Sequence, residues 1–149
     1  MRNLLASKVA ELDIDDVPAD ASLSTDTIDT QGFQSAIAFF VADEVGAAPA
    51  AIKIQESDDS GMSGATDIFA FGTTTDVAGT NNALAAFTAN EVVAVQIDLV
   101  GKKRYLKATF TAGASGNSDF GFAMLLGDAV NESPEDSAAG FGTTFLYRV

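Results

Sequence analysis

The chain has 149 residues, no cysteine and no histidine, and a formal charge of −13 from 21 acidic and 8 basic residues. This composition excludes disulfides, thiol chemistry and every histidine-based catalytic or zinc site, and its negative charge argues against binding to nucleic acid or an anionic membrane. We therefore expect no enzymatic activity, no cofactor and no metal. No apolar run approaches the length of a membrane span.

The first 31 residues are the most polar part of the chain, and the sequence predicts a polar N-terminal arm over residues 1–31. Both a short helix from Asn3 to Leu12 and an extended segment fit the pattern. A polar arm that packs poorly on itself usually needs a partner to order it. Leu4, Leu5 and Leu12 are therefore candidate partner-binding residues.

After Gly32 the chain changes to short apolar bursts between turn residues, which is typical of strands. The predicted strands are Ser35–Ala42, Ala51–Ser57, Asp67–Phe71, Glu91–Val100, Lys103–Thr111, Phe120–Gly127 and Thr143–Val149. Such a series predicts an all-β domain over residues 32–149, a single antiparallel β-sandwich of jelly-roll-like or Ig-like type with about seven to eight short strands.

Two of these strands have a distinctive apolar pattern. Ser35–Ala42 places Ile37, Phe39 and Val41 on one face and the small Ala36 and Ala38 on the other. Phe120–Gly127 is apolar at almost every position, which predicts burial on both faces. Between the strands, residues 72–90 are rich in Thr, Asn and Ala and indicate a long loop.

The stretch "VGKKRYLKATF" (residues 100–110) holds four of the eight basic residues. A two-residue turn at Gly101-Lys102 would make it half of a hairpin, since glycine at the first central position suits a type II′ turn. In that register Ile97 faces Leu106 and Val93 faces Phe110. The apolar pairs then share one face, which supports the hairpin.

In the same register Lys103, Tyr105 and Lys107 point to a polar face beside Asp98, and Lys102 lies at the tip. The simplest interpretation is a solvated hairpin whose cations pair with nearby carboxylates. The alternative is a protein-contact patch, and it makes Lys102, Lys103, Tyr105 and Lys107 candidate partner-binding residues. Nucleic acid is the least favoured partner.

Clustered carboxylates such as Asp58-Asp59-Ser60-Gly61 could suggest calcium, but they lack the spacing of an EF-hand, and a polar loop tip is the better interpretation. A carboxylate pair for glycoside hydrolysis stays open as an alternative, because 21 acidic residues allow some pair to converge.

Four segments of the chain resemble small virion proteins of tailed bacteriophages and gene-transfer particles over roughly residues 28–130. The segments are "DTQGFQSAIAFFVADEVG", "AIKIQESDDS", "VGKKRYLKATFTAG" and "FGFAMLLGDA". The resemblance implies a head-decoration, cement or head-spike role on the capsid exterior of the virion, and it brings no catalytic residues with it.

The sequence therefore predicts a non-enzymatic structural protein that binds neighbouring major capsid subunits, and also copies of itself, but neither nucleic acid nor membrane. Two alternatives stay open: a carbohydrate- or receptor-binding module of a head fibre or tail, and a tail-tube or head–tail connector component. The chain has no tryptophan and only two tyrosines, which disfavours a sugar-binding platform.

Overall fold

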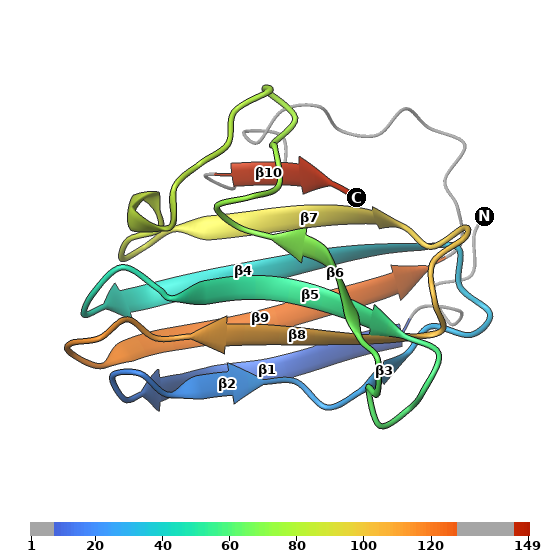
Figure 1. The fold of residues 1–149 in the computed structure, drawn as a ribbon, viewed down its shortest axis with the longest axis horizontal. Helices are drawn as coiled ribbons and strands as arrows, with labels where there is room; N and C mark the ends of the chain where they lie inside the picture. The colour runs from blue at the N-terminus through green and yellow to red at the C-terminus, as the bar shows by residue number, and fades with distance from the viewer. Residues whose placement is uncertain (1–7, 128–144) are drawn as a thin grey trace.

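The computed structural model describes residues 8–127 and 145–149, and for residues 8–15 it describes only the backbone. Ten strands form two stacked sheets (Figure 1). Sheet A has the order β1-β9-β4-β7-β10, and sheet B has the order β2-β8-β5-β6, with β3 also paired to β8. The strands are β1 (Lys8–Val17), β2 (Ser22–Ser24), β3 (Ile28–Asp29), β4 (Ser35–Val45), β5 (Ala51–Ser57), β6 (Thr66–Ala70), β7 (Val92–Asp98), β8 (Tyr105–Thr111), β9 (Ser118–Gly127) and β10 (Phe145–Arg148).

The predicted all-β sandwich is confirmed, and each predicted strand overlaps an observed one. One pairing departs from the antiparallel prediction, because β10 runs parallel to β7, with Tyr147 opposite Val95. Within the described residues the helical structure is a single 3-10 turn, η2 (Leu84–Ala86), in the long loop before β7. No described helix is long and apolar enough to cross a membrane.

The predicted N-terminal arm does not extend over residues 8–29, which supply β1, β2 and β3 to the two sheets. β1 pairs antiparallel with β9. The segment up to Leu12, for which a helix was one of the two predictions, is therefore a strand from Lys8 onward. The cause is backbone pairing, because a segment with polar side chains can still complete a sheet edge through its main chain. Leu4 and Leu5 lie outside the described residues.

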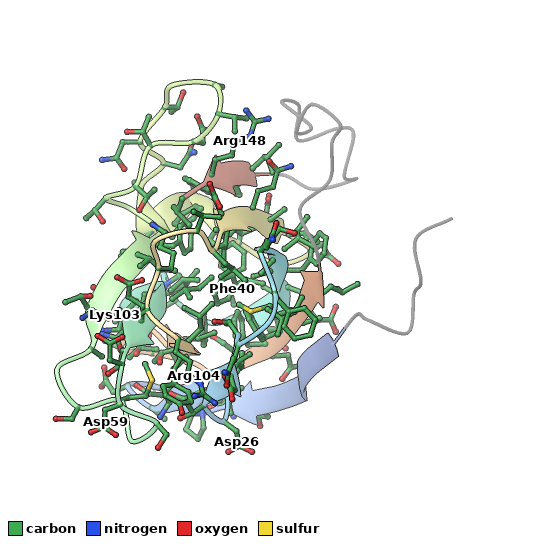
Figure 2. The ribbon with its side chains drawn as sticks, turned by 90° about the vertical axis from the view of Figure 1, so that its right-hand side faces the viewer. Asp26, Phe40, Asp59, Lys103, Arg104 and Arg148 are labelled. Carbon is green, nitrogen blue, oxygen red and sulfur yellow. The ribbon has the colours of Figure 1, made fainter. Side chains whose placement is uncertain are left out.

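The core lies between the two sheets and is built around Phe40 of β4, whose side chain is fully buried (Figure 2). The Phe40 ring centroid lies 4.9 Å from that of Phe122, 5.9 Å from Phe120 and 6.0 Å from Phe69. Phe110 and Phe120 stack at 4.0 Å across the sandwich. These contacts join both sheets, so the phenylalanine rings pack the two layers against each other.

On β4 the core face is the one with the small residues, since Ala36, Ala38, Phe40 and Ala42 are buried. Ile37, Phe39 and Val41 alternate with them on the outer face of sheet A and are half-buried. The expected burial of β9 on both faces is wrong at one position, because Leu125 on the same outer face is 43 % exposed.

The predicted hairpin between residues 93–99 and 104–110 does not form, because β7 belongs to sheet A and β8 to sheet B. β7 pairs with β4 and β10, and β8 pairs with β5, β2 and β3. The residues expected to pair, such as Ile97 and Leu106, are both buried and line the core from different sheets. The apolar alternation therefore identified the correct face of each strand but the wrong neighbour.

The turn that joins β7 to β8 explains this switch of sheets. The Lys102 N–H donates to the Leu99 carbonyl at 3.1 Å, so Gly101 occupies the third position of the turn, with φ of +81°. A positive φ at that position is typical of a type II turn, which splays its flanking strands instead of matching their twist as a type II′ turn does. The chain therefore leaves sheet A and enters sheet B.

Two loops at one end of the sandwich touch backbone to backbone at glycines. A Cβ on Gly46 would lie 2.6 Å from the carbonyl carbon of Gly116, and one on Gly116 would lie 2.8 Å from the Gly46 Cα. Gly116 also has a positive φ of +71°. Side chains are excluded at this contact, so the loops that follow β4 and β8 are locked together by small residues.

The long loop before β7 is anchored on the C-terminal strand through Tyr147. The Asn82 side-chain amide donates to the Tyr147 hydroxyl oxygen at 3.0 Å and to Asp76 Oδ2 at 2.8 Å. The other Asp76 oxygen accepts from the Ala78 and Thr80 N–H groups. Burial raises the pKa of the Tyr147 phenol above its ordinary value, and the Asn82 hydrogen bond opposes this shift only in part.

We expect this phenol to make the protein less stable at high pH. The folded state holds the Tyr147 proton more tightly than the unfolded state, so the stabilisation is present below pH ~10 and is lost as the pH rises through the folded pKa. Tyr147→Phe removes this effect, and the free energies of unfolding of wild type and variant, measured in urea from pH 8 to 11, should converge as the pH rises. Parallel curves would contradict the assignment.

Candidate protein-interaction face

The outer face of sheet B is mainly polar, with alanines at Ala51 and Ala70. On β8 the side chains alternate, with Leu106, Ala108 and Phe110 buried in the core and Lys107 and Thr109 on the outer side. We use the name "sheet B face" for nine polar residues on the outward side of this sheet. They are Ser22, Ser24, Lys53, Gln55, Asp67, Tyr105, Lys107, Thr109 and Thr111.

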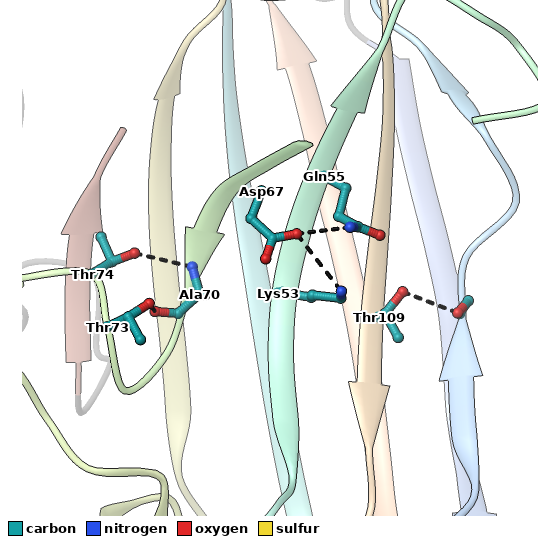
Figure 3. Close-up of polar contacts among 8 residues, drawn as sticks. Lys53, Gln55, Asp67, Ala70, Thr73, Thr74 and Thr109 are labelled. Carbon is teal, nitrogen blue, oxygen red and sulfur yellow. Dashed lines mark hydrogen bonds and ion pairs between the residues drawn. The ribbon is translucent and has the colours of Figure 1, made fainter. Parts of the chain in front are cut away.

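Strand β5 lies beside β8 and continues the pattern, with Lys53 opposite Thr109 and Gln55 opposite Lys107. Asp67 of β6 joins both β5 side chains: Gln55 Nε2 donates to Asp67 Oδ1 at 2.7 Å, and Lys53 Nζ lies 3.7 Å from the same oxygen (Figure 3). One carboxylate therefore holds two long side chains in place on this face.

Hydroxyl pairs fix the other side of the face. Ser22 Oγ lies 2.8 Å from Thr111 Oγ1, and Ser24 Oγ lies 3.1 Å from Thr109 Oγ1, across the β2–β8 pairing. Thr109 and the Lys53–Gln55–Asp67 group lie side by side in Figure 3. Cross-strand pairs of this type each contribute a few tenths to about 1 kcal/mol and restrict the rotamers of the face.

At the end of β8, Arg104 forms a two-point contact with Asp29 of β3. Its Nε donates to Asp29 Oδ1 at 2.9 Å and its Nη2 donates to Asp29 Oδ2 at 2.8 Å. This hydrogen bond is the main reason that the pKa of Arg104 is raised above its ordinary value. The guanidinium also lies 5.0 Å from the centre of the Tyr105 ring, so this half-buried ring is covered in part by Arg104.

Lys102, Lys103 and Lys107 differ from Lys53 and Arg104, because none of their ammonium groups has an ion-pair partner among the side chains of residues 16–127 and 145–149. The Lys103 main chain is anchored, with its N–H donating to Glu56 Oε2 at 3.0 Å. The expected pairing of these cations with Asp98 is wrong. Asp98 lies in sheet A and accepts from the Val100 N–H at 2.9 Å.

The structure thus places Tyr105 and Lys107 on β8, and Lys102 and Lys103 in the turn segment before it. Leu12, the remaining described candidate, lies in β1 opposite Phe122, in the other sheet. The predicted partner-binding residues therefore do not form one site. Sequence reasoning missed Lys53, whose place beside Thr109 depends on the pairing of β5 with β8.

The opposite face of the molecule has a different chemistry. The outer face of sheet A is apolar at Ile37, Val41 and Leu125, and it ends in a row of carboxylates formed by Asp16, Asp119 and Glu44 on neighbouring strands. No group of residues that could hold a metal ion occurs among the described residues. The two faces of the sandwich therefore carry different charges, with lysines gathered on sheet B.

The two stacked sheets, with ten strands among the described residues, define the chain as a β-sandwich protein. No protein-family model and no curated protein matches its sequence. A solved structure, described as the PBSX exported protein XepA, is similar in fold, with a TM-score of 0.59 and 19 % sequence identity. The match covers 92 % of this chain and 43 % of that chain, so this protein spans less than half the length of XepA.

Proposed function

We propose that the protein is a non-enzymatic structural component of a phage particle, which decorates or cements the capsid exterior by binding neighbouring major capsid subunits. The main observation in support of the proposal is the location of the four segments that resemble virion proteins. They contain β4, β5, β8 and most of β9, which are four of the five inner strands of the two sheets. The resemblance therefore concerns the scaffold of the sandwich and is not confined to its loops.

The fold likeness to the PBSX exported protein XepA supports the same proposal at the level of architecture. A sandwich without a long flat edge can be displayed in many copies without edge-to-edge aggregation. Multiple copies suit cementing, because many modest contacts then add to the stability of the particle.

The sheet edges of this protein fit such a role. The Val77 N–H donates to the Leu146 carbonyl at 3.0 Å and covers part of the β10 edge. At the end of β6, the Ala70 N–H donates to Thr74 Oγ1 at 3.0 Å and the Ala70 carbonyl accepts from Thr73 Oγ1 at 3.2 Å (Figure 3). Both β1 and β6 are interrupted by register shifts, which also discourage pairing with another chain.

The test is the location of the protein in particles. We expect purified particles to contain it in a fixed ratio to the major capsid protein, with density on the outer surface in a reconstruction of the intact particle. Particles assembled without it should release DNA at a lower temperature. Absence from purified particles, or density in the tail tube or connector, would overturn the capsid role.

A further inference from the structure

The cations of this acidic protein are concentrated on one side of the sandwich. Five of its eight basic residues belong to the sheet B face or to the turn that leads into β8. They are Lys53, Lys102, Lys103, Arg104 and Lys107. Figure 2 shows Lys103 beside sheet B and Arg148 near β10 of the other sheet. A chain with 21 acidic residues thus presents one surface where its positive charges gather.

Two of these five cations have an ion-pair partner among the side chains of residues 16–127 and 145–149, in the Lys53–Asp67 and Arg104–Asp29 pairs. The ammonium groups of Lys102, Lys103 and Lys107 can bind a carboxylate from outside without breaking an ion pair with any of these side chains. Charge pairs at an interface speed association and select partners of opposite charge. The availability of these three ammonium groups favours a binding role for this face.

The remaining side chains of the face indicate what kind of surface fits it. Ser22, Ser24, Thr109 and Gln55 are polar and held by hydrogen bonds, and Tyr105 is partly covered by Arg104. The face therefore offers hydrogen bonds and positive charge, with no exposed aromatic platform for a sugar ring. Such a face fits a polar protein surface with separate carboxylates.

Nucleic acid fits the face less well. The lysines are interleaved with Asp67, Glu56 and Asp29, which would repel a polymer that carries one negative charge about every 1.7 Å. Discrete carboxylates on a protein can align with discrete lysines and avoid these acidic positions.

We propose that the sheet B face, with Lys53 and Lys107 on it and Lys103 in the adjoining turn, is the surface by which the protein docks on an acidic surface of the major capsid protein. This inference rests on the proposed function and specifies which of the two outer faces meets the capsid. The apolar outer face of sheet A then points away from that contact.

Zero-length carbodiimide cross-linking of purified particles tests the contact directly, because it joins an amine to a carboxylate that touches it. We expect cross-linked peptides that join Lys103 or Lys107 to acidic residues of the major capsid protein. The inference would be overturned if these lysines cross-linked only to a second copy of this chain. It would also be overturned if they formed no cross-links while other residues of the protein cross-linked to the capsid.

Charge reversal gives an independent measurement. Lys107→Glu should weaken binding to bare particles about ten-fold or more, and raising the salt concentration should reduce the difference from wild type. The matched control is Arg148→Glu, which changes the net charge equally on the β10 edge of sheet A and should leave binding unchanged. If Lys107→Glu disturbs folding, Lys103→Glu, in the turn before β8, provides the same test and should show the same loss of binding.

The two proposals fail in different ways. If the protein is absent from particles, the capsid role itself is wrong. If the protein is present at full occupancy and both lysine reversals bind like wild type, the capsid role stands and only the assignment of the sheet B face is overturned. Equal losses in Lys107→Glu and Arg148→Glu would show a general effect of net charge and would also overturn it.

Discussion

Phe40→Ala should lower the free energy of unfolding by about 3 to 5 kcal/mol, the range for removing a buried phenylalanine ring from a core. Phe40 is fully buried and contacts Phe69 in sheet B as well as Phe120 and Phe122 in sheet A. The variant leaves a cavity where the two layers meet. Urea unfolding followed by circular dichroism measures the loss as a lower midpoint with an unchanged slope.

Phe39→Ala is the matched control, because Phe39 is the neighbouring residue on the same strand and lies on the outer face of sheet A, half-buried. We expect it to cost less than half as much, since its ring buries less area. Equal losses in the two variants would contradict the assignment of Phe40 to the core between the sheets.

Gly46→Ala should be nearly as damaging, with a loss of about 3 kcal/mol or more from overpacking. The new Cβ would lie 2.6 Å from the Gly116 carbonyl carbon and 2.7 Å from the Asn117 carbonyl oxygen. Both are main-chain atoms and cannot move away by a change of rotamer. The two loops must therefore move apart to make room for the methyl group.

Gly127→Ala provides the comparison for that variant. Gly127 also lies at a strand end, but a Cβ there meets nothing within 4 Å, and its φ is not positive. We expect a change within about 0.5 kcal/mol, as for most substitutions that create no clash. The thermal midpoints of the two variants, measured side by side, test whether close backbone contact makes Gly46 essential.

The sequence was sufficient to predict the strands and the sandwich, because both depend on local alternation of apolar and polar residues. Strand β5 illustrates this, since its bounds Ala51–Ser57 agree with the prediction. The pattern was less informative for β4, where both faces are apolar. The choice of the face that points to the core depends on the partner sheet and is not a property of the strand itself.

The pairing of strands could not be predicted in the same way. Residues 93–110 satisfied every local requirement of a hairpin, yet the two strands line the core from opposite sheets. In a sandwich, two consecutive strands with inward apolar residues look the same whether they pair side by side or face each other. Only the position of Gly101 within the turn distinguishes the two arrangements.

The candidate site shows the same limit. The basic residues of "VGKKRYLKATF" were recognised from sequence, but the carboxylates that contact this stretch were not. Asp29 meets Arg104 across 75 residues of chain, and Glu56 meets Lys103 across 47. Contacts of this range depend on the order of strands in sheet B. That Lys102, Lys103 and Lys107 have no ion-pair partner in the described part of the chain is therefore a finding of the structure.

The pairing of β1 with β9 has a consequence for how the chain reaches its native state. The hydrogen bond from Asn117 to Asp16 at the end of this pair spans 101 residues, and contacts of such high contact order are slow to form. Sheet A acquires its β1 edge only after β9 has been synthesised, and until then β4 lacks one of its two neighbours. A partly synthesised chain therefore exposes an open, apolar strand, and expression at lower temperature or with chaperones should raise the soluble yield.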